Sequence, residues 1–140
     1  MKTRFSSIVT YKYSKMQEDE VALQKALARL QNAKEELARS IAGLEELQTP
    51  QEGNIQNFLA SRLLFDAQFR LIEKNKEWVA FEDSQVIAAR EQLKQSMIEY
   101  EKFKYLEAEE IKKMQKMLAS KESKRLDDLA IISYNQKEAI

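Results

Sequence analysis

The chain contains no histidine and no cysteine, and only one proline and two glycines among its 140 residues. Without histidine, acid–base and nucleophilic mechanisms that depend on an imidazole are excluded, as are metal sites built on it. Without cysteine there is no disulfide framework and no thiolate metal site, which fits a reducing compartment. Two glycines ten residues apart cannot form a phosphate-cradling loop. The sequence therefore predicts a protein that is not an enzyme and has no catalytic, cofactor or metal site.

The scarcity of turn residues also argues against a sheet protein, which needs a turn about every eight to twelve residues. The chain is instead rich in Ala, Leu, Glu, Lys, Gln and Arg, the residues that lose least side-chain freedom in a helix. Apolar residues make up 44% of the chain and charged residues 33%. This balance is typical of a folded protein with strongly polar faces. The predicted fold class is all-α.

Positive and negative charges balance, with 23 Lys and Arg against 23 Asp and Glu. No global field would steer such a chain to nucleic acid or to a membrane. No apolar run approaches the roughly 18 residues of a membrane span, and the apolar patch near the N-terminus is too short for a signal peptide. We therefore expect a cytosolic protein that binds neither nucleic acid nor a small-molecule ligand.

Two columns of apolar residues recur at a spacing of seven, which is the pattern of a coiled-coil seam. A coiled-coil heptad has a second seam position, which we place four residues after each member of the first column. Half of the residues at this second position are polar. Such a seam buries little area per turn and favours two helices over a bundle. The first column is Val9, Met16, Leu23, Leu30, Leu37 and Leu44, and its second positions are Tyr13, Glu20, Leu27, Lys34, Ile41 and Gln48. The other column is Phe58, Phe65, Ile72, Val79, Val86, Leu93 and Tyr100.

The only proline and one of the two glycines fall between the two columns. Thr49 can cap a helix whose first position is Pro50, and Gly53 and Asn54 can take the positive φ angles that a reversal needs. The stretch therefore predicts the tip of a hairpin. We expect one domain over residues 1–140, an antiparallel coiled-coil hairpin with a longer C-terminal helix. Its expected parts are a first helix over about 5–48, a turn over about 49–54 and a second helix over about 55–136.

Antiparallel pairing across this turn sets Leu30 against Ile72. The five remaining heptad pairs in this register are also apolar. A register three heptads later, with Leu30 against Leu93, scores nearly as well but requires a structured excursion at the tip. Because helix connections usually have about 2 to 8 residues, the first register is favoured. In that register the second helix has no partner from about Glu101 onward, although apolar residues continue at helical spacing. An apolar stripe of this length predicts a partner.

Two basic clusters and one aromatic cluster are the candidate sites. The first fifteen residues carry four positive charges and no acid, and residues 112–125 carry six basic residues against one Glu. A solvated charged face explains both clusters, and so does an end that enters an acidic or polar cavity of a partner. Aromatic residues gather after the turn, where Phe58 and Phe65 fit core packing and Phe69 lies off the column. Exposed aromatic residues there would anchor a protein partner.

The chain ends in "KESKRLDDLA", where a Lys-rich run precedes an Asp-Asp pair. In this ending, in its length and in the place of its single turn, the chain resembles the FliJ family of flagellar export proteins. It implies a two-helix antiparallel coiled coil similar to the rotor stalk, the γ subunit, of F-type ATPases. Such a stalk sits inside the hexameric flagellar export ATPase of the type III apparatus and stimulates it, contacts the cytoplasmic part of the export gate, and escorts unladen substrate chaperones. The implied location is the cytoplasm, peripherally on the inner membrane at the flagellar base.

The resemblance also implies roles for particular residues. The ring-binding residues would be Arg4, Lys12, Lys15, Lys121, Lys124 and Arg125. The gate-binding residues would be Phe58, Phe65 and Phe69. Two alternatives remain open: a structural or dimerising coiled-coil adaptor, in which the helix from about Glu101 pairs with a second copy, and a chaperone of exported substrates.

Overall fold

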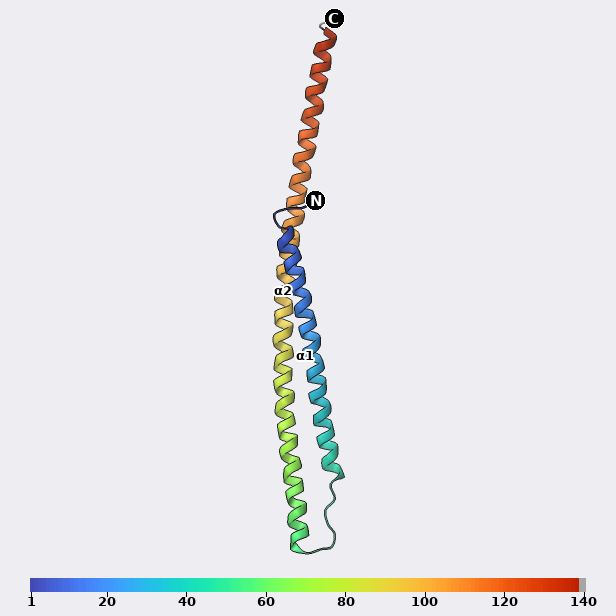
Figure 1. Cartoon of the computed structure of the whole chain (residues 1–140), viewed down its shortest axis with the longest axis vertical. Coiled ribbons are helices and arrows are strands. Elements are labelled where there is room, and N and C mark those ends of the chain that lie inside the picture. Colours follow the sequence, from blue (N-terminus) through green and yellow to red (C-terminus); the bar gives the residue numbers. More distant parts are fainter. Residues whose placement is uncertain (139–140) are drawn as a thin grey trace. The chain divides into compact units, whose positions relative to one another are not determined.

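A computed structural model of the chain describes residues 1–138, which form two helices, α1 (Ser6–Glu46) and α2 (Ile55–Glu138) (Figure 1). The two helices pack against each other in an antiparallel hairpin, and no strand occurs in the described residues. The predicted all-α hairpin with a longer second helix is therefore confirmed. The chain divides into two compact units, which are described separately below. Unit 2 is Met16–Ser96, and unit 1 is Met1–Lys15 together with the part of α2 that begins at Met97.

A capping box holds the start of α1 in unit 1. The backbone N–H of Phe5 donates to the Thr3 hydroxyl at 3.1 Å, and the backbone N–H of Thr3 donates to the Ser6 hydroxyl at 2.8 Å. These bonds satisfy N–H groups that the first turn of a helix leaves without a carbonyl partner. The side chains of Thr3 and Ser6 therefore fix where α1 begins.

The cap of α2 in unit 2 differs from the predicted one, whereas the first residue of α2, Ile55, lies where the second helix is expected to begin, at about residue 55. Thr49 and Pro50 lie in the loop, and α2 begins five residues after Pro50, at Ile55. Its cap is Asn54, whose side-chain oxygen accepts from the backbone N–H of Asn57 at 3.0 Å. The helix start at Pro50 with Thr49 as its cap was wrong, because the backbone N–H of Asn57 donates to both the side-chain and the carbonyl oxygen of Asn54, which caps the helix that begins at Ile55.

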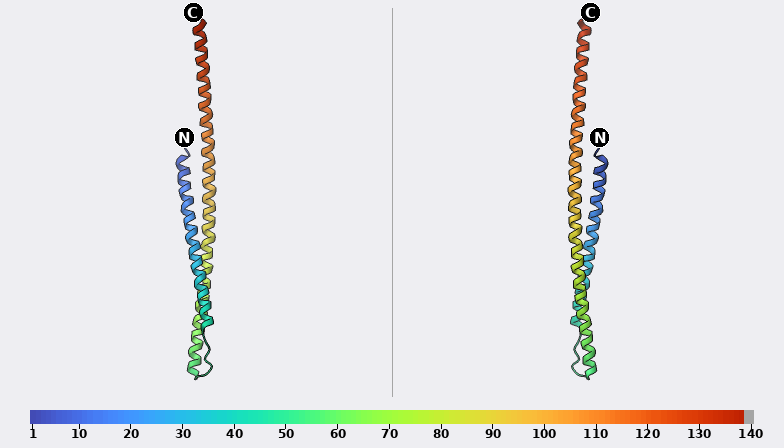
Figure 2. Two further views of the ribbon diagram at one scale, coloured as in Figure 1. Left: turned by 90° about the vertical axis from the view of Figure 1, so that its right-hand side faces the viewer. Right: turned by 90° about the vertical axis from the view of Figure 1, so that its left-hand side faces the viewer.

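Gly53 provides the reversal of the loop. Its φ is 151°, and no other residue in the described chain has a positive φ, so the prediction of positive φ is confirmed for Gly53 and wrong for Asn54. A Cβ at position 53 would also lie 2.7 Å from the side-chain nitrogen of Asn57. Figure 2 shows this loop running beside the first turns of α2, where α1 has already ended.

The seam of unit 2 holds every residue that is fully buried in the described chain. Its apolar centre is a cluster of Ala26, Leu30 and Val86, against which Leu23 and Val79 pack. The members of the two predicted heptad columns that belong to unit 2 are buried or half-buried, with Phe58 alone exposed. Phe58 is exposed because it stands on α2 beyond the end of α1, so its predicted core role was wrong.

The second position of the seam in α1 is one residue earlier than predicted. Ala26, Ala33 and Ser40 are buried there, whereas the predicted Leu27 and Ile41 are exposed. The spacing from the first column is thus three residues, and the side chains at this position are small. Small side chains let the two helices approach closely, and the larger apolar residues beside them made the neighbouring position look like the seam.

Both registers considered from the sequence were wrong. The favoured register places residue 73 opposite Arg29, but the Arg29 guanidinium contacts the Glu82 carboxylate at 3.2 Å, nine residues further along α2. Leu30 accordingly packs with Val86 rather than with Ile72 or Leu93. Apolar columns with a repeat of seven match each other in many registers, so they could not identify the true one.

Polar pairs across the seam distinguish the observed register from the others. The amide nitrogen of Asn75 donates to the Ser40 hydroxyl at 3.1 Å, and the Ser96 hydroxyl donates to the Asp19 carboxylate. Every buried side-chain nitrogen and oxygen in the described residues has a hydrogen-bond partner. Because an unpartnered buried polar group costs about 1–3 kcal/mol, registers that separate these partners are disfavoured.

Unit 1 is held by rings and ion pairs instead of a buried seam. The Phe5 and Phe103 ring centroids are 6.5 Å apart, and those of Tyr13 and Tyr100 are 5.4 Å apart. Half-buried residues of α2 continue to Met114, and every described residue from 115 on is exposed. The part of α2 that lacks cover from α1 therefore begins near residue 115 and not near Glu101. The difference arises because α1 packs further along α2 than the predicted register places it.

Candidate protein interaction sites

The two buried carboxylates of the hairpin, Glu82 and Asp19, bind side chains of the opposite helix and so stabilise the fold. Glu82 is paired with Arg29, and Asp19 accepts from the Ser96 hydroxyl and, at 3.4 Å, from the side chain of Gln92. No group of three acidic side chains in residues 1–138 is placed to hold a metal ion. The features that remain to be explained in the described chain are exposed surfaces suited to protein partners.

The N-terminal basic residues of unit 1 are already engaged within the chain. Arg4 forms an ion pair with Glu110 at 3.7 Å, and Lys12 forms one with Glu99 at 3.5 Å. The Lys12 ammonium also lies 5.5 Å from the centre of the Phe103 ring. These contacts tie the start of α1 to α2 and reduce the charge that Arg4 and Lys12 offer to a partner. Lys15, the third predicted residue, is half-buried.

The C-terminal basic residues are different. Lys121, Lys124 and Arg125 are exposed and form no ion pair in the described structure. They stand eleven or more residues beyond Glu110 on the same helix, about 16 Å at 1.5 Å per residue. The structure therefore does not bring the two basic clusters together. Large apolar side chains are exposed on the same stretch of α2, namely Met117, Leu118, Leu126, Leu129, Ile131, Ile132 and Tyr134.

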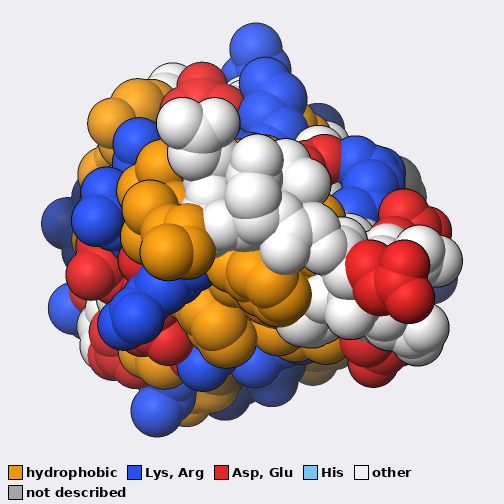
Figure 3. All heavy atoms as spheres, turned by 90° about the horizontal axis from the view of Figure 1, so that it is seen from below, with side chains coloured by type: hydrophobic (Ala, Val, Ile, Leu, Met, Phe, Trp, Pro, Cys, Tyr) orange, Lys and Arg blue, Asp and Glu red, His pale blue; other side chains and the backbone are white. Residues whose placement is uncertain are grey.

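The first turns of α2 in unit 2 carry an exposed apolar surface, which we call the tip surface. Phe58 and Phe69 have exposed fractions of 44% and 52%, while Phe65 is half-buried. Sequence reasoning identified these aromatic residues but missed the aliphatic side chains around them, because the aliphatic residues lie outside the heptad column. The exposed aliphatic members of the tip surface are Ile55, Leu59, Leu63 and Leu64. Figure 3 looks onto the loop end and shows apolar side chains gathered there.

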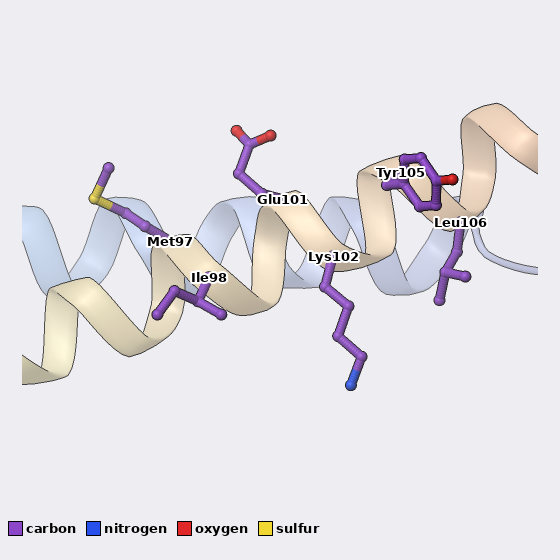
Figure 4. A pocket seen from close by; sticks show the side chains of 6 residues that line it. All are labelled: Met97, Ile98, Glu101, Lys102, Tyr105 and Leu106. Carbon is purple, nitrogen blue, oxygen red and sulfur yellow. The ribbon is translucent and has the colours of Figure 1, made fainter.

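A further surface in unit 1, which we call the α2 strip, was not found from the sequence. It is a shallow hollow of about 550 Å³ lined by Met97, Ile98, Glu101, Lys102, Tyr105 and Leu106. Figure 4 shows the side chains in two rows along α2, with the ribbon of α1 behind them. The signal in the sequence was present as two pairs of apolar residues, Met97 with Tyr105 and Ile98 with Leu106, each eight residues apart with one charged residue midway, but these residues fall outside the seam columns.

None of the helices in the described part of the chain carries an apolar stretch that would cross a bilayer. The fold and the exposed surfaces define a class of protein, a two-helix coiled coil with surfaces suited to protein partners. The family model described as "Flagellar FliJ protein" matches residues 1–139. The chain therefore belongs to this family of non-catalytic flagellar proteins and is a component related to flagellar export. No curated protein and no solved structure gives a significant match to the chain.

Proposed function

We propose that the protein is the central stalk of the flagellar type III export apparatus, which inserts into the hexameric export ATPase and stimulates it. The observation that supports this most is the stretch of α2 after residue 115, which α1 does not cover. It combines exposed apolar side chains with Lys121, Lys124 and Arg125, whose charges have no partner in the described structure. Such a helix is stabilised by a cavity that covers its apolar side chains and supplies acidic or polar groups.

The two basic clusters have unequal parts in this proposal. A partner must compete with Glu110 and Glu99 for Arg4 and Lys12, whereas Lys121, Lys124 and Arg125 need no internal pair to be broken. We therefore assign the main ring contact to the C-terminal cluster and a supporting contact to Arg4, Lys12 and Lys15. Salt should weaken the interaction, because contacts between exposed charges are screened.

The test is the ATPase rate of the cognate export ATPase with and without this protein. The triple variant Lys121→Glu, Lys124→Glu and Arg125→Glu should stimulate with an apparent affinity at least about tenfold weaker, since three favourable contacts become repulsive. The matched control reverses three exposed lysines elsewhere, Lys25, Lys34 and Lys74, and should stimulate like the unaltered protein. If the unaltered protein leaves the ATPase rate unchanged, the stalk proposal is wrong.

We further propose that the tip surface contacts the cytoplasmic part of the export gate. Exposed Phe side chains surrounded by aliphatic ones are suited to a hydrophobic partner groove. The double variant Phe58→Ala and Phe69→Ala should lose binding to the purified cytoplasmic part of the gate while it still stimulates the ATPase. Phe81→Ala is the matched control, because Phe81 is also an exposed aromatic residue of α2 but lies away from the tip surface. Equal binding by both variants would contradict the assignment.

The proposal also includes the escort of unladen substrate chaperones and a cytoplasmic position, peripherally on the inner membrane at the flagellar base. Its support is membership of the family. We expect the protein to co-purify with chaperones that have released their export substrate. We also expect it to sediment with inner membranes only when the export gate is present. A dimerising adaptor would give neither result and would leave the ATPase unaffected.

A further inference from the structure

The α2 strip of unit 1 is exposed although it is largely apolar. Met97, Ile98 and Tyr105 have exposed fractions of 48%, 50% and 64%. The residues repeat in steps of four, so that Met97, Glu101 and Tyr105 form one row and Ile98, Lys102 and Leu106 the other (Figure 4). Each row has an apolar residue at both ends and one charge in the middle. The charges of the two rows are opposite.

This order of residues is complementary to itself. If a second copy of α2 lies antiparallel on the strip, with a twofold axis between positions 101 and 102, each row meets the opposite row of the other copy. Glu101 then faces Lys102 of the second copy, and Ile98 faces Tyr105. Met97 meets Leu106 in the same way. A parallel copy in register would instead set Glu101 beside Glu101 and Lys102 beside Lys102, which is unfavourable.

The sequence of α2 continues the same complementarity on both sides. Lys94 and Glu109 are equally distant in sequence from the centre of the strip, and so are Glu91 and Lys112. Glu109 and Lys112 form an ion pair within the chain at 3.5 Å, and in the antiparallel arrangement Lys94 of the other copy approaches Glu109 of this pair while Glu91 approaches Lys112. The charge order therefore selects a second copy of this chain as the occupant.

We propose that the α2 strip is a self-association surface on which a second copy of the chain packs antiparallel. None of its residues belongs to the basic cluster at Lys121–Arg125 or to the tip surface, so the dimer is separate from the proposed ring and gate contacts. It is a state of the free protein. The surface is small, so we expect weak association.

The test is the mass in solution by sedimentation equilibrium over a range of concentrations. Glu101→Lys alone and Lys102→Glu alone should each weaken the dimer about tenfold, because two attractive contacts become repulsive. An equimolar mixture of the two variants should form a heterodimer, since all central contacts are attractive again. The double variant should form a homodimer for the same reason. Glu73→Lys, which breaks the exposed ion pair with Lys76 outside the strip, should leave the dimer unchanged.

The natural absence of cysteine allows a test of orientation. Under mild oxidation, a mixture of Ile98→Cys and Tyr105→Cys chains should form a disulfide-linked pair, whereas Tyr105→Cys alone should form little. A monomer mass at about 1 mM, where a weak interface of this size would be populated, would overturn the proposal. So would charge variants that associate like the unaltered protein, or Tyr105→Cys chains that link to each other as readily as the mixture. The ATPase assay of the Glu101→Lys variant is independent, since the stalk proposal expects normal stimulation by it.

Discussion

The two units of the hairpin hold α1 and α2 together by different means. In unit 2 the contact is a narrow buried seam in which Ala33 is fully covered and Asn75 is hydrogen-bonded to Ser40. In unit 1 no described residue is fully buried, and the contacts between the helices include two ring pairs, two ion pairs and the Lys12 ammonium over the Phe103 ring. Apolar burial stabilises by about 25 cal/mol per Å², while an exposed ion pair contributes about 0–1 kcal/mol.

The difference indicates how stability is distributed along the hairpin. Segments with few buried contacts open locally at a lower free energy than a buried core does. The first turns of α1 in unit 1 should therefore open while unit 2 stays folded. Three substitutions test this contrast.

The largest effect is expected at the closest contact of unit 2. Ala33→Leu places a bulky side chain where Ala33 has no exposed surface, so the helices must separate or distort. Overpacking of this kind destabilises by about 1–3 kcal/mol, which denaturant unfolding followed by circular dichroism measures. The matched control is Ala28→Leu on the exposed face of α1, which should change the free energy of unfolding by less than about 0.5 kcal/mol. Equal effects at both positions would mean that the seam is not tightly packed.

A smaller effect is expected from the polar part of the same seam. Asn75→Ala removes the donors to the Ser40 hydroxyl and, at 3.3 Å, to the backbone carbonyl of Glu36, which should cost about 1–2 kcal/mol. Ser40→Ala should cost less, and the double variant should cost less than the sum of the two. A double-mutant cycle measures this coupling, and a coupling near zero would contradict the hydrogen bond between the two side chains.

The smallest effect on global stability is expected in unit 1. Phe5→Ala removes the ring contact with Phe103 and the Arg4 contact over the Phe5 ring. The free energy of global unfolding should fall by less than about 0.5 kcal/mol, because this segment opens before the seam does. Hydrogen exchange should nevertheless accelerate in the first turns of α1 and remain unchanged around Ala33. Faster exchange throughout unit 2 would show that the two units unfold together.

The sequence predicted most of the fold, because helix-forming residues, the single turn and the apolar columns are all local signals. It did not predict the register, since heptad columns match after any shift by a multiple of seven. The deciding contacts, such as Arg29 with Glu82, join residues far apart in the chain and belong to positions that looked like solvated surface. The small residues Ala26 and Ala33 were missed for a related reason: their burial depends on how closely the partner helix approaches.

The candidate sites were predictable to a lesser degree. Charge counting located the basic residues, but only the structure shows that Arg4 and Lys12 are paired with acids of α2 while Lys121 is not. The exposure of Phe58 depends on where α1 ends relative to α2, which again requires the register. The apolar residues of the α2 strip lie outside the heptad columns, but only the structure shows that α1 leaves Met97, Ile98 and Tyr105 exposed.

The polar pairs of unit 2 have a mechanical consequence. Asp19, Arg29 and Ser40 lie about three turns apart along α1, and each is bonded to a different residue of α2. If α1 slid along α2 by one heptad, the apolar columns would match again, but all three polar pairs would be separated at once. The seam therefore resists sliding of α1 along the axis of α2 at three separate points. A push or pull on α1 within unit 2 is transmitted to α2 without slippage.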